Sequence, residues 1–476
     1  MVDIAVSPQT KEKQMSYVVA VDFGSTFTKV VVVDRARKKI ILSDKTPSTV
    51  GTDAAIGMNH CFEKARTVLS AEEFDEAVKL ASSSAAGGLR MSVIGLTKSL
   101  STLAGKSAAL GAGAKIIGNY IGTLTESKVH DLEKSKTEIV LLCGGYEHGN
   151  TTMVMKNAEM LAKSKLTAPI IYSGNSELDK DIRTIMRAHK KQCYSVENII
   201  PKLGTLNVEP VQDVIRDLFL NRITGMKGFN EVKKEFDNQF VPTPVAVLGA
   251  GELLNKGTTN KKGFGPLVIM DIGGATTDVY SFNENKSYQG AKMIGIEEAF
   301  AKRTVEGDLG MRESSGGVIT EEYIDRVVND LNITEEQLRK SIANRMQHID
   351  YLPDCEMESK IDDEIARLAV HVAIRRHAGR VEHSYNKNCQ NIQIGKDLSE
   401  VTKVIGTGGI LVYNRDPLNI FKAIEKSESD TGALLPKRIE SYLDTEYVLY
   451  SAGLLKEIDE DAAFEIMTNS IKPCKR

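Results

Sequence analysis

One short pattern occurs twice in the chain, and it restricts the possible folds more than any other feature. The segments Asp22–Lys29 and Asp271–Asp278 both carry Asp, Gly and Thr at their first, third and seventh places. Each copy lies between two runs of apolar, β-branched residues, and the copies are 271 − 22 = 249 residues apart in a chain of 476. A repeat at about half the chain length predicts two related lobes that face each other.

The residue types in the repeat suit a turn that binds phosphate. Glycine lets the chain turn sharply and approach a ligand closely, and successive amide N–H groups form an anion-binding nest. One such pattern could be an ordinary β-hairpin turn, but two equivalent copies favour phosphate binding. The predicted ligands are Gly24, Ser25, Thr26, Thr28 and Lys29 in the first copy, and Gly273, Gly274, Thr276 and Thr277 in the second.

The aspartates that open the two copies, Asp22 and Asp271, predict a metal site. A carboxylate repels phosphate, but it can hold a hydrated Mg²⁺, which takes oxygen ligands and keeps several waters. We expect both aspartates to bind the metal and to position the attacking water, and we favour Asp271 as the catalytic base. The copies end differently, in Lys29 and Asp278. This difference indicates charge neutralisation in the first lobe and metal or water handling in the second.

A third glycine-rich turn follows an apolar strand at Val404–Leu411, in the second half of the chain. Glycines there would let a flat adenine ring and its ribose lie against the backbone. Taken alone, the segment is better explained as a tight strand-to-helix turn. Behind two phosphate turns it indicates an ATP site, so we predict adenosine contacts at Gly406, Thr407, Gly408 and Gly409.

The order of elements predicts an α/β protein. Short β-rich runs at Tyr17–Val21, Val30–Val33 and Lys39–Leu42 indicate an antiparallel meander. Further along, strands alternate with helices, which is typical of parallel sheets. The predicted helices in this region are Ala71–Leu80 and Ala104–Ile117.

A proline-rich break and a glycine- and lysine-rich stretch before residue 265 mark the predicted central boundary. The predicted units are a flexible tail at 1–16, a first ATPase lobe with insertions at 17–263, and a second ATPase lobe at 264–476.

Composition excludes several classes of protein. The formal net charge of −3 gives no reason to expect nucleic acid or an anionic membrane as partner. No apolar run reaches the roughly 18 residues of a membrane span, and residues 1–16 lack a hydrophobic signal region. The six cysteines are scattered and form no CxxC pair, so a reducing cytoplasm is expected rather than a disulfide framework or a zinc site.

The two phosphate turns followed by the adenosine turn resemble the superfamily of actin, the sugar kinases and the heat-shock chaperones. More narrowly, the chain resembles the MutL (also called GlmL) family, whose members are regarded as reactivating ATPase chaperones of adenosylcobalamin-dependent glutamate mutase. The stretches that carry this resemblance are 83–91, 271–278, 303–312 and 407–409.

The resemblance implies two related actin-like ATPase lobes, with ribonuclease H-like folds and a nucleotide cleft between them. It implies ATP and Mg²⁺ as cofactors and the mutase as protein partner. On its residues alone, the stretch 303–312 could be a helix cap and a solvated loop. The resemblance implies instead that it is a nucleotide-contacting loop, with Glu306 and Gly307 as contacts. The chain departs from many members at Leu142–Gly149, where an acidic-glycine tract is replaced by a loop with Tyr146 and Glu147, so we assign this loop no catalytic role.

Two other functions remain open for the same superfamily. A small-molecule kinase would phosphorylate a metabolite stoichiometrically, but no acid–base pair outside the phosphate turns is evident in the sequence. An actin-like assembly protein would sediment in an ATP-dependent manner. A chaperone should hydrolyse ATP slowly alone and respond to its mutase.

Overall fold

The computed structural model divides into two compact units. It describes residues 16–24, 27–84, 89–98, 100–224, 227–236, 240–386 and 389–474. Unit 1 comprises residues 1–262 and 448–469, and unit 2 comprises residues 263–447 and 470–476. The division after residue 262 lies next to the boundary expected from the sequence. Residues 448–469, which the sequence placed in the second lobe, belong instead to unit 1.

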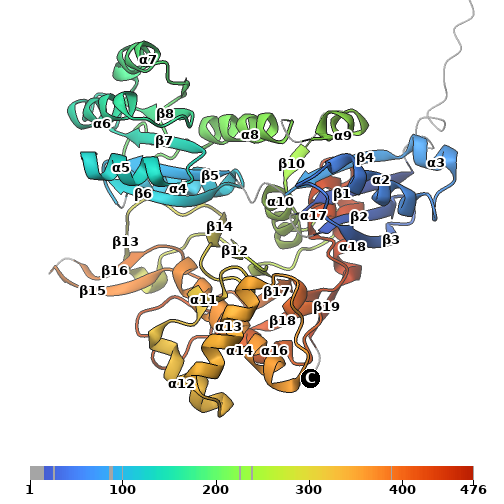
Figure 1. Cartoon of the computed structure of the whole chain (residues 1–476). Coiled ribbons are helices and arrows are strands. Elements are labelled where there is room, and N and C mark those ends of the chain that lie inside the picture. Colours follow the sequence, from blue (N-terminus) through green and yellow to red (C-terminus); the bar gives the residue numbers. More distant parts are fainter. Residues whose placement is uncertain are drawn as a thin grey trace, which may run out of the picture. The chain divides into compact units, whose positions relative to one another are not determined.

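The main sheet of unit 1 has the strand order β10-β4-β1-β2-β3 (Figure 1). Strands β1 (Tyr17–Phe23), β2 (Phe27–Asp34) and β3 (Lys39–Pro47) form the predicted antiparallel meander. Strands β4 (Val78–Ser83) and β10 (Phe240–Pro242) continue the sheet in parallel on the other side of β1. Nearly every residue of β1 and β2 is buried, which indicates that both faces of the sheet are covered.

Helix α17 (Leu449–Leu455) is the element that brings the C-terminal segment into unit 1. It packs against helix α10 (Thr243–Lys256) and against β1 and β4. The helices are so close that a Cβ atom on Gly453 would lie 1.8 Å from the carbonyl oxygen of Ala246. This backbone approach, which only glycine permits, explains why 448–469 joins the first unit.

A second sheet is inserted into unit 1 between β4 and β10. All of its strands are parallel, in the order β6-β5-β7-β8-β9. The strands are β5 (Arg90–Gly95), β6 (Lys115–Ile121), β7 (Ile139–Gly144), β8 (Ile170–Gly174) and β9 (Cys193–Ser195). Its apolar core joins the β5, β7 and β8 strands to helices α5 (Glu126–Lys134), α6 (Thr152–Lys163) and α7 (Asp179–Ala188). This is the doubly wound arrangement expected when strands alternate with helices.

The main sheet of unit 2 has the order β14-β12-β11-β17-β18-β19. Its strands are β11 (Leu267–Ile272), β12 (Thr277–Phe282), β14 (Ala301–Glu306), β17 (Lys403–Thr407), β18 (Glu440–Asp444) and β19 (Ile471–Pro473). A small separate sheet contains β13 (Lys292–Ile294), β15 (Arg380–Asn386) and β16 (Cys389–Ile394). The long helix α14 (Glu356–His377) provides much of the apolar core that packs against the main sheet.

The remaining helices complete the two units. In unit 1 they are α2 (Ala54–Ala65), α3 (Ala71–Glu76), α4 (Ser101–Gly111), α8 (Glu209–Thr224), α9 (Phe229–Glu235) and the 3₁₀ turn η1 (Ser176–Leu178). In unit 2 they are α11 (Ser315–Val318), α12 (Glu321–Leu331), α13 (Glu335–Gln347), α15 (Gly409–Val412), α16 (Pro417–Phe421) and the 3₁₀ turns η2 (Tyr288–Gly290) and η3 (Lys422–Ile424). Helix α18 (Glu460–Ser470) runs to the end of the 448–469 segment. No helix within these described ranges is both long and apolar enough to span a bilayer.

The two main sheets repeat one topology. In each, the first three strands are antiparallel neighbours, and the next two strands of the sheet lie parallel on the other side of the first strand. Numbered within each unit, this order is 3-2-1-4-5, the ribonuclease H-like order of actin-like ATPase lobes. The predicted fold class is therefore confirmed: the chain is an α/β protein with two related lobes of this kind.

Two predicted helices end earlier than the sequence pattern suggested. Helix α3 stops at Glu76, and Val78 begins β4, so only part of Ala71–Leu80 is helical. Helix α4 stops at Gly111, because Gly113 adopts a left-handed φ of 84° that ends the helix before β6. The apolar residues that follow each helix belong to strands that pair with distant partners.

Candidate functional site at the strand-end turns

The second predicted turn is a tight hairpin at the carboxyl end of β11. The N–H of Gly273 donates to the carbonyl of Thr276 at 2.9 Å, and Asp271 pairs with Asp278 across the hairpin. Among the described residues, the N–H groups of Gly274, Ala275 and Thr276 donate no hydrogen bond, and Gly274 is exposed. Successive unpaired amides of this kind form an anion-binding nest.

The loop after β14 holds the backbone of this hairpin through two hydrogen bonds. The N–H groups of Met311 and Arg312 donate to the carbonyls of Gly273 and Gly274 at 3.0 and 2.7 Å. A Cβ atom on Gly310 would lie 2.5 Å from the Gly274 oxygen, so glycine is required for this approach. The stretch 303–312 is thus neither a helix cap nor a free loop. It is a strand followed by a segment that fixes the phosphate-turn backbone.

The predicted adenosine turn lies beside the second phosphate turn. Strand β17 runs parallel to β11, with Thr407 opposite Asp271. Gly408 has a φ of 99°, and a Cβ atom there would lie 2.3 Å from the carbonyl oxygen of Ile272. The structure therefore brings Asp271, Thr407 and Gly408 together at one sheet edge, and Gly409 follows at the start of α15.

Gly406 does not share this position, although the sequence placed it with the adenosine contacts. A Cβ atom on Gly406 would lie 2.4 Å from Cζ of Phe421 and 2.7 Å from Cδ1 of Leu411. Its missing side chain therefore makes room for the core beneath β17 rather than for a ligand.

Asp444 and Tyr447 belong to the same edge, and sequence reasoning missed both. Asp444 ends β18, the next parallel strand, and accepts a hydrogen bond from the Thr407 hydroxyl at 3.4 Å. Burial raises the pKa of Tyr447, and the nearby Tyr413, Asp271 and Asp444 raise it further. The charges of Asp271 and Asp444 therefore both favour the protonated form of the Tyr447 phenol. An apolar strand ending in aspartate, as in Tyr442-Leu443-Asp444, was the available signal.

Four other predicted contacts, two in this turn and two at the end of β14, are engaged within the protein. The buried Thr277 hydroxyl donates to the Leu309 carbonyl at 2.6 Å, so it serves the hairpin rather than an external phosphate. The Thr276 hydroxyl donates to Asp278 at 3.2 Å. Burial raises the pKa of Glu306, and its ion pair with Arg376 at 2.7 Å opposes that shift. Glu306 thus contacts an arginine, and the carbonyl of Gly307 accepts from Ser314 at 2.9 Å.

The first predicted turn, in unit 1, holds its aspartate in a closed polar cluster. Asp22 is only 1% exposed and accepts hydrogen bonds from Ser82 at 2.8 Å and Thr243 at 2.5 Å. Lys29 forms an ion pair with it at 3.7 Å. Lys29 was expected to neutralise charge, and the charge that it neutralises here is that of Asp22. Ser82 is the next-to-last residue of β4 and Thr243 begins α10, so neither could be assigned to the site from the local pattern.

The rest of the first turn divides into two outcomes. Gly24 closes a hairpin in the same way as Gly273, with its N–H 3.0 Å from the Phe27 carbonyl. Ser25 and Thr26 lie outside the described residues. Thr28 pairs with Phe23, one place along from Asp22, and therefore projects from the opposite face of the sheet. It is fully buried against α2, and a Cβ atom on Gly57 would lie 2.9 Å from its hydroxyl oxygen. Thr28 is thus a core residue, not a phosphate ligand.

Few carboxylates are placed to bind a metal at the sheet edge formed by Asp271, Thr407, Gly408 and Asp444, which we call the unit 2 edge. Within the described ranges, no group of three or more His, Cys, Asp or Glu side chains is placed to bind an ion. A cation beside Asp271 and Asp444 would need ligand or water oxygens to complete its shell. Mg²⁺ commonly binds in that manner, through one or two carboxylates and substrate phosphates.

Comparison with known proteins identifies the family of the chain. The family model described as MutL protein matches residues 18–471. Protein MutL of Clostridium tetanomorphum is 39% identical over 448 residues, which cover 94% of this chain and 97% of that protein. The chain belongs to the MutL family. Its two repeated turns, the loop behind the second turn and the Thr407–Gly409 turn all fall within the matched range.

Solved structures resemble the MutL-family chain only weakly. The ethanolamine utilization protein EutJ from Carboxydothermus hydrogenoformans has a TM-score of 0.28 at 10% identity, over 95% of this chain and 89% of that chain. Glucokinase from Balamuthia mandrillaris in complex with glucose has a TM-score of 0.31 at 8% identity, over 97% and 99%. Xylulose kinase from Bifidobacterium adolescentis has a TM-score of 0.28 at 10% identity, over 96% and 94%. The fold assignment rests on the strand order instead.

Proposed function

We propose that this MutL-family protein binds Mg²⁺ and ATP at the unit 2 edge and hydrolyses ATP there. The observation that supports this best is the row of unpaired amides at Gly274–Thr276 beside the partly exposed carboxylate of Asp271. The donor set suits the ligand, because amides bind phosphate oxygens while carboxylates bind Mg²⁺. Both groups lie on a hairpin whose backbone is fixed by the loop around Gly310.

Each residue of the edge would have a distinct role. The Gly274–Thr276 amides would bind the terminal phosphates, and Gly408 and Gly409 would border the adenosine. Asp271 would hold the metal and orient the attacking water, and it would accept the proton of that water. Mg²⁺, when bound, neutralises charge on the transferred phosphoryl group. In unit 1, the ion pair of Asp22 with Lys29 makes a direct metal role for Asp22 secondary to that of Asp271.

We further propose that ATP hydrolysis serves to reactivate an adenosylcobalamin-dependent mutase, with glutamate mutase as the client. Membership of the MutL family supports this step. In this proposal, ATP binding changes the equilibrium between conformations of the chaperone, and the mutase binds one of them more tightly. Damaged cobalamin would then exchange for adenosylcobalamin on the client.

A reactivation assay tests the proposal directly. Glutamate mutase inactivated with a damaged cobalamin is mixed with the protein, adenosylcobalamin and Mg-ATP, and mutase activity is followed over time. Recovery that needs hydrolysable ATP supports the chaperone role. The proposal would be rejected if no activity returned, or if an Asp271→Ala variant restored it equally well.

Substitution of Gly408 tests the adenosine side of the edge. Gly408→Ala should weaken ATP binding about ten-fold or more, because a Cβ atom 2.3 Å from the Ile272 carbonyl pushes β17 away from the phosphate turn. Gly290→Ala is the matched control, since Gly290 also has a positive φ, of 76°, but has open space around its Cβ position. Titration with a fluorescent ATP analogue measures both variants. Equal affinity in both would contradict an adenosine site at this turn.

A further inference from the structure

The inserted parallel sheet contains a second candidate binding site, far along the chain from either phosphate turn. Within this sheet, β5 is followed by β6 on one side and by β7, β8 and β9 on the other. The chain therefore reverses its direction of winding between β5 and β7. In open doubly wound sheets, ligands bind beyond the carboxyl ends of the strands at this switch point. The topology therefore predicts a ligand site at the carboxyl ends of β5 and β7.

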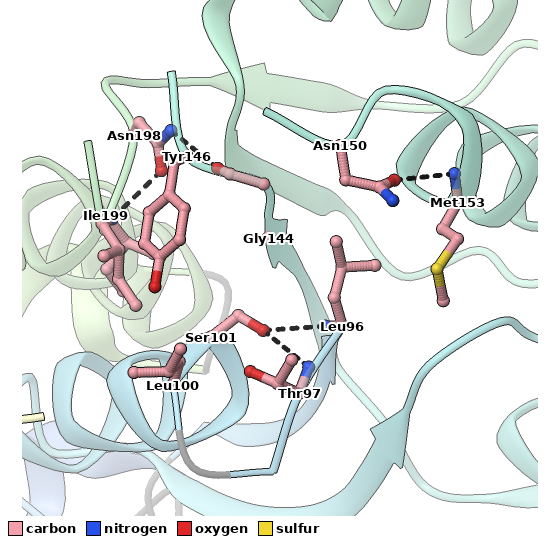
Figure 2. Close-up of a pocket in the computed structure, with 12 residues that line it drawn as sticks. Leu96, Thr97, Leu100, Ser101, Gly144, Tyr146, Asn150, Met153, Asn198 and Ile199 are labelled. Atoms are coloured by element: carbon pink, nitrogen blue, oxygen red, sulfur yellow. Dashed lines mark hydrogen bonds between the residues drawn. The ribbon is translucent and has the colours of Figure 1, made fainter. Parts of the chain in front are cut away.

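A cavity of about 260 Å³ lies at that place (Figure 2). Leu96 and Leu100 contribute to it from the β5–α4 connection, Gly144 and Tyr146 from the end of β7, Met153 from α6, and Ile199 from the segment after β9. None of the described residues that line the cavity is Asp, Glu, His, Lys or Arg. A ligand in contact with these residues would therefore be uncharged where it meets them.

Three polar side chains of the lining, Ser101, Asn150 and Asn198, bond to backbone groups beside the cavity. The Ser101 hydroxyl oxygen accepts from the N–H of Leu96 at 2.8 Å and of Thr97 at 3.1 Å. Asn150 accepts from the Met153 N–H at 2.9 Å, and Asn198 donates to the Gly145 carbonyl at 3.0 Å. Figure 2 shows these bonds along the walls. They hold the cavity open in a defined shape and leave its interior mainly apolar, as is common in preformed small-molecule sites.

The Tyr146–Glu147 departure from the family pattern has a structural role here. Glu147 accepts a hydrogen bond from the Ser176 N–H at 3.1 Å and from the Asn198 amide at 2.7 Å, and the Ser176 hydroxyl also donates to it. It therefore ties the loop after β7 to the loops after β8 and β9. This attachment holds Tyr146 at the wall of the cavity. Glu147 is a positioning residue, and Tyr146 is the residue that a ligand would contact.

We propose that this cavity binds an uncharged heteroaromatic ring. Pockets for drug-sized ligands measure roughly 300–1,000 Å³, so a cavity of about 260 Å³ accommodates a mono- or bicyclic ring rather than a complete dinucleotide. The Met153 sulfur and the Tyr146 ring make favourable contacts with aromatic groups. Leu96, Leu100 and Ile199 cover the remaining surface. The site is separate from the phosphate turns and does not depend on ATP binding there.

Methyl NMR of the full chain tests the proposal with indole, adenine and adenosine as probes. The methionine methyl groups are labelled with ¹³C, and the Met153 signal is identified from a Met153→Leu variant. Each probe that fits should shift the Met153 methyl signal in a saturable manner, while the Met155 signal on the same helix stays in place. Binding of adenine without adenosine indicates a free base, and binding of both indicates the base of a nucleoside. Inorganic phosphate should produce no shift.

Substitutions of residues that line the cavity distinguish a loss of probe binding from a general disturbance of the fold. Tyr146→Ala should raise the Kd of the best probe at least ten-fold, and Leu100→Trp should abolish binding by filling the cavity. His148→Asn, in the same loop but outside the cavity, should leave the Kd within two-fold, because asparagine tolerates the positive φ of 60° at this position. Asp271→Asn should not affect the probe. The proposal is overturned if no aromatic probe shifts the Met153 signal, or if Leu100→Trp binds as well as the unmodified chain.

Discussion

Asp271→Asn should lower the ATPase rate by about 10²- to 10⁴-fold, the usual contribution of a positioned general base. Asparagine keeps the size of the side chain and its place at the end of β11, but it loses the negative charge for Mg²⁺ and the ability to accept a proton. The backbone amides at Gly274–Thr276 are unchanged, so nucleotide binding should persist more strongly than turnover. A phosphate-release assay and a nucleotide-binding titration on the same preparation measure the two effects separately.

Asp22→Asn provides the informative comparison. Asp22 occupies the equivalent place in unit 1 but is buried among Ser82, Thr243 and Lys29. Its replacement should disturb that cluster and lower the stability of unit 1 while reducing turnover less than Asp271→Asn does. If Asp271→Asn retained more than one-tenth of the ATPase rate, or if Asp22→Asn were the more severe variant, the assignment of the base to the second turn would be wrong.

Arg345→Met should destabilise unit 2 by about 3 to 5 kcal/mol, the usual effect of removing one partner from a buried ion pair. Arg345 is fully buried and forms ion pairs with Glu358 at 2.6 Å and Asp362 at 2.7 Å. Without it, these carboxylates remain in a poorly solvated place. We expect a value at the lower end, because Glu358 is partly exposed and Asp362 keeps a second ion pair, with Arg312 at 2.9 Å.

Arg345→Met should also affect the second phosphate turn. Arg312 connects Asp362 to the phosphate turn, since its N–H donates to the Gly274 carbonyl at 2.7 Å. Urea denaturation followed by a probe in unit 2 measures the stability, and ATP affinity measures the effect on the turn. Arg339→Met is the matched control, because Arg339 lies on the same helix but its ion pairs with Glu321 and Glu335 are exposed. A loss of stability no larger than that of the control would contradict the buried network.

The hairpin turns could be predicted because their signals are local. Both phosphate turns combine a buried β-branched strand with a glycine that must close the turn, and the structure places Gly24 and Gly273 in the same hydrogen bond. The proximity of Gly408 to the second turn also followed from a simple rule, since carboxyl ends of parallel strands meet at one sheet edge. These features depend on a few adjacent residues and on strand direction.

Other members of the site depend on chain pairings that a single sequence does not display. Asp444 reaches the edge only because β18 pairs with β17, and Thr243 reaches Asp22 only because β10 pairs with β4. The error for Thr28 is different in kind. Its pairing with Phe23 could have been inferred from the hairpin itself, and the two-residue alternation of a strand then places it on the buried face.

The late position of 448–469 in the chain also governs when each unit can become complete during synthesis. Unit 1 lacks α17 until residue 455 has been made, so the surface of α10 next to Gly453 stays uncovered while the 455 − 262 = 193 residues after Lys262 are added. At roughly 5 to 20 residues per second, that interval lasts about 10 to 40 seconds. Unit 2 also gains its edge strand β19 only at residues 471–473. The last few dozen residues therefore close both folding units, and a chain truncated before them would leave two incomplete cores instead of one finished lobe and one missing lobe.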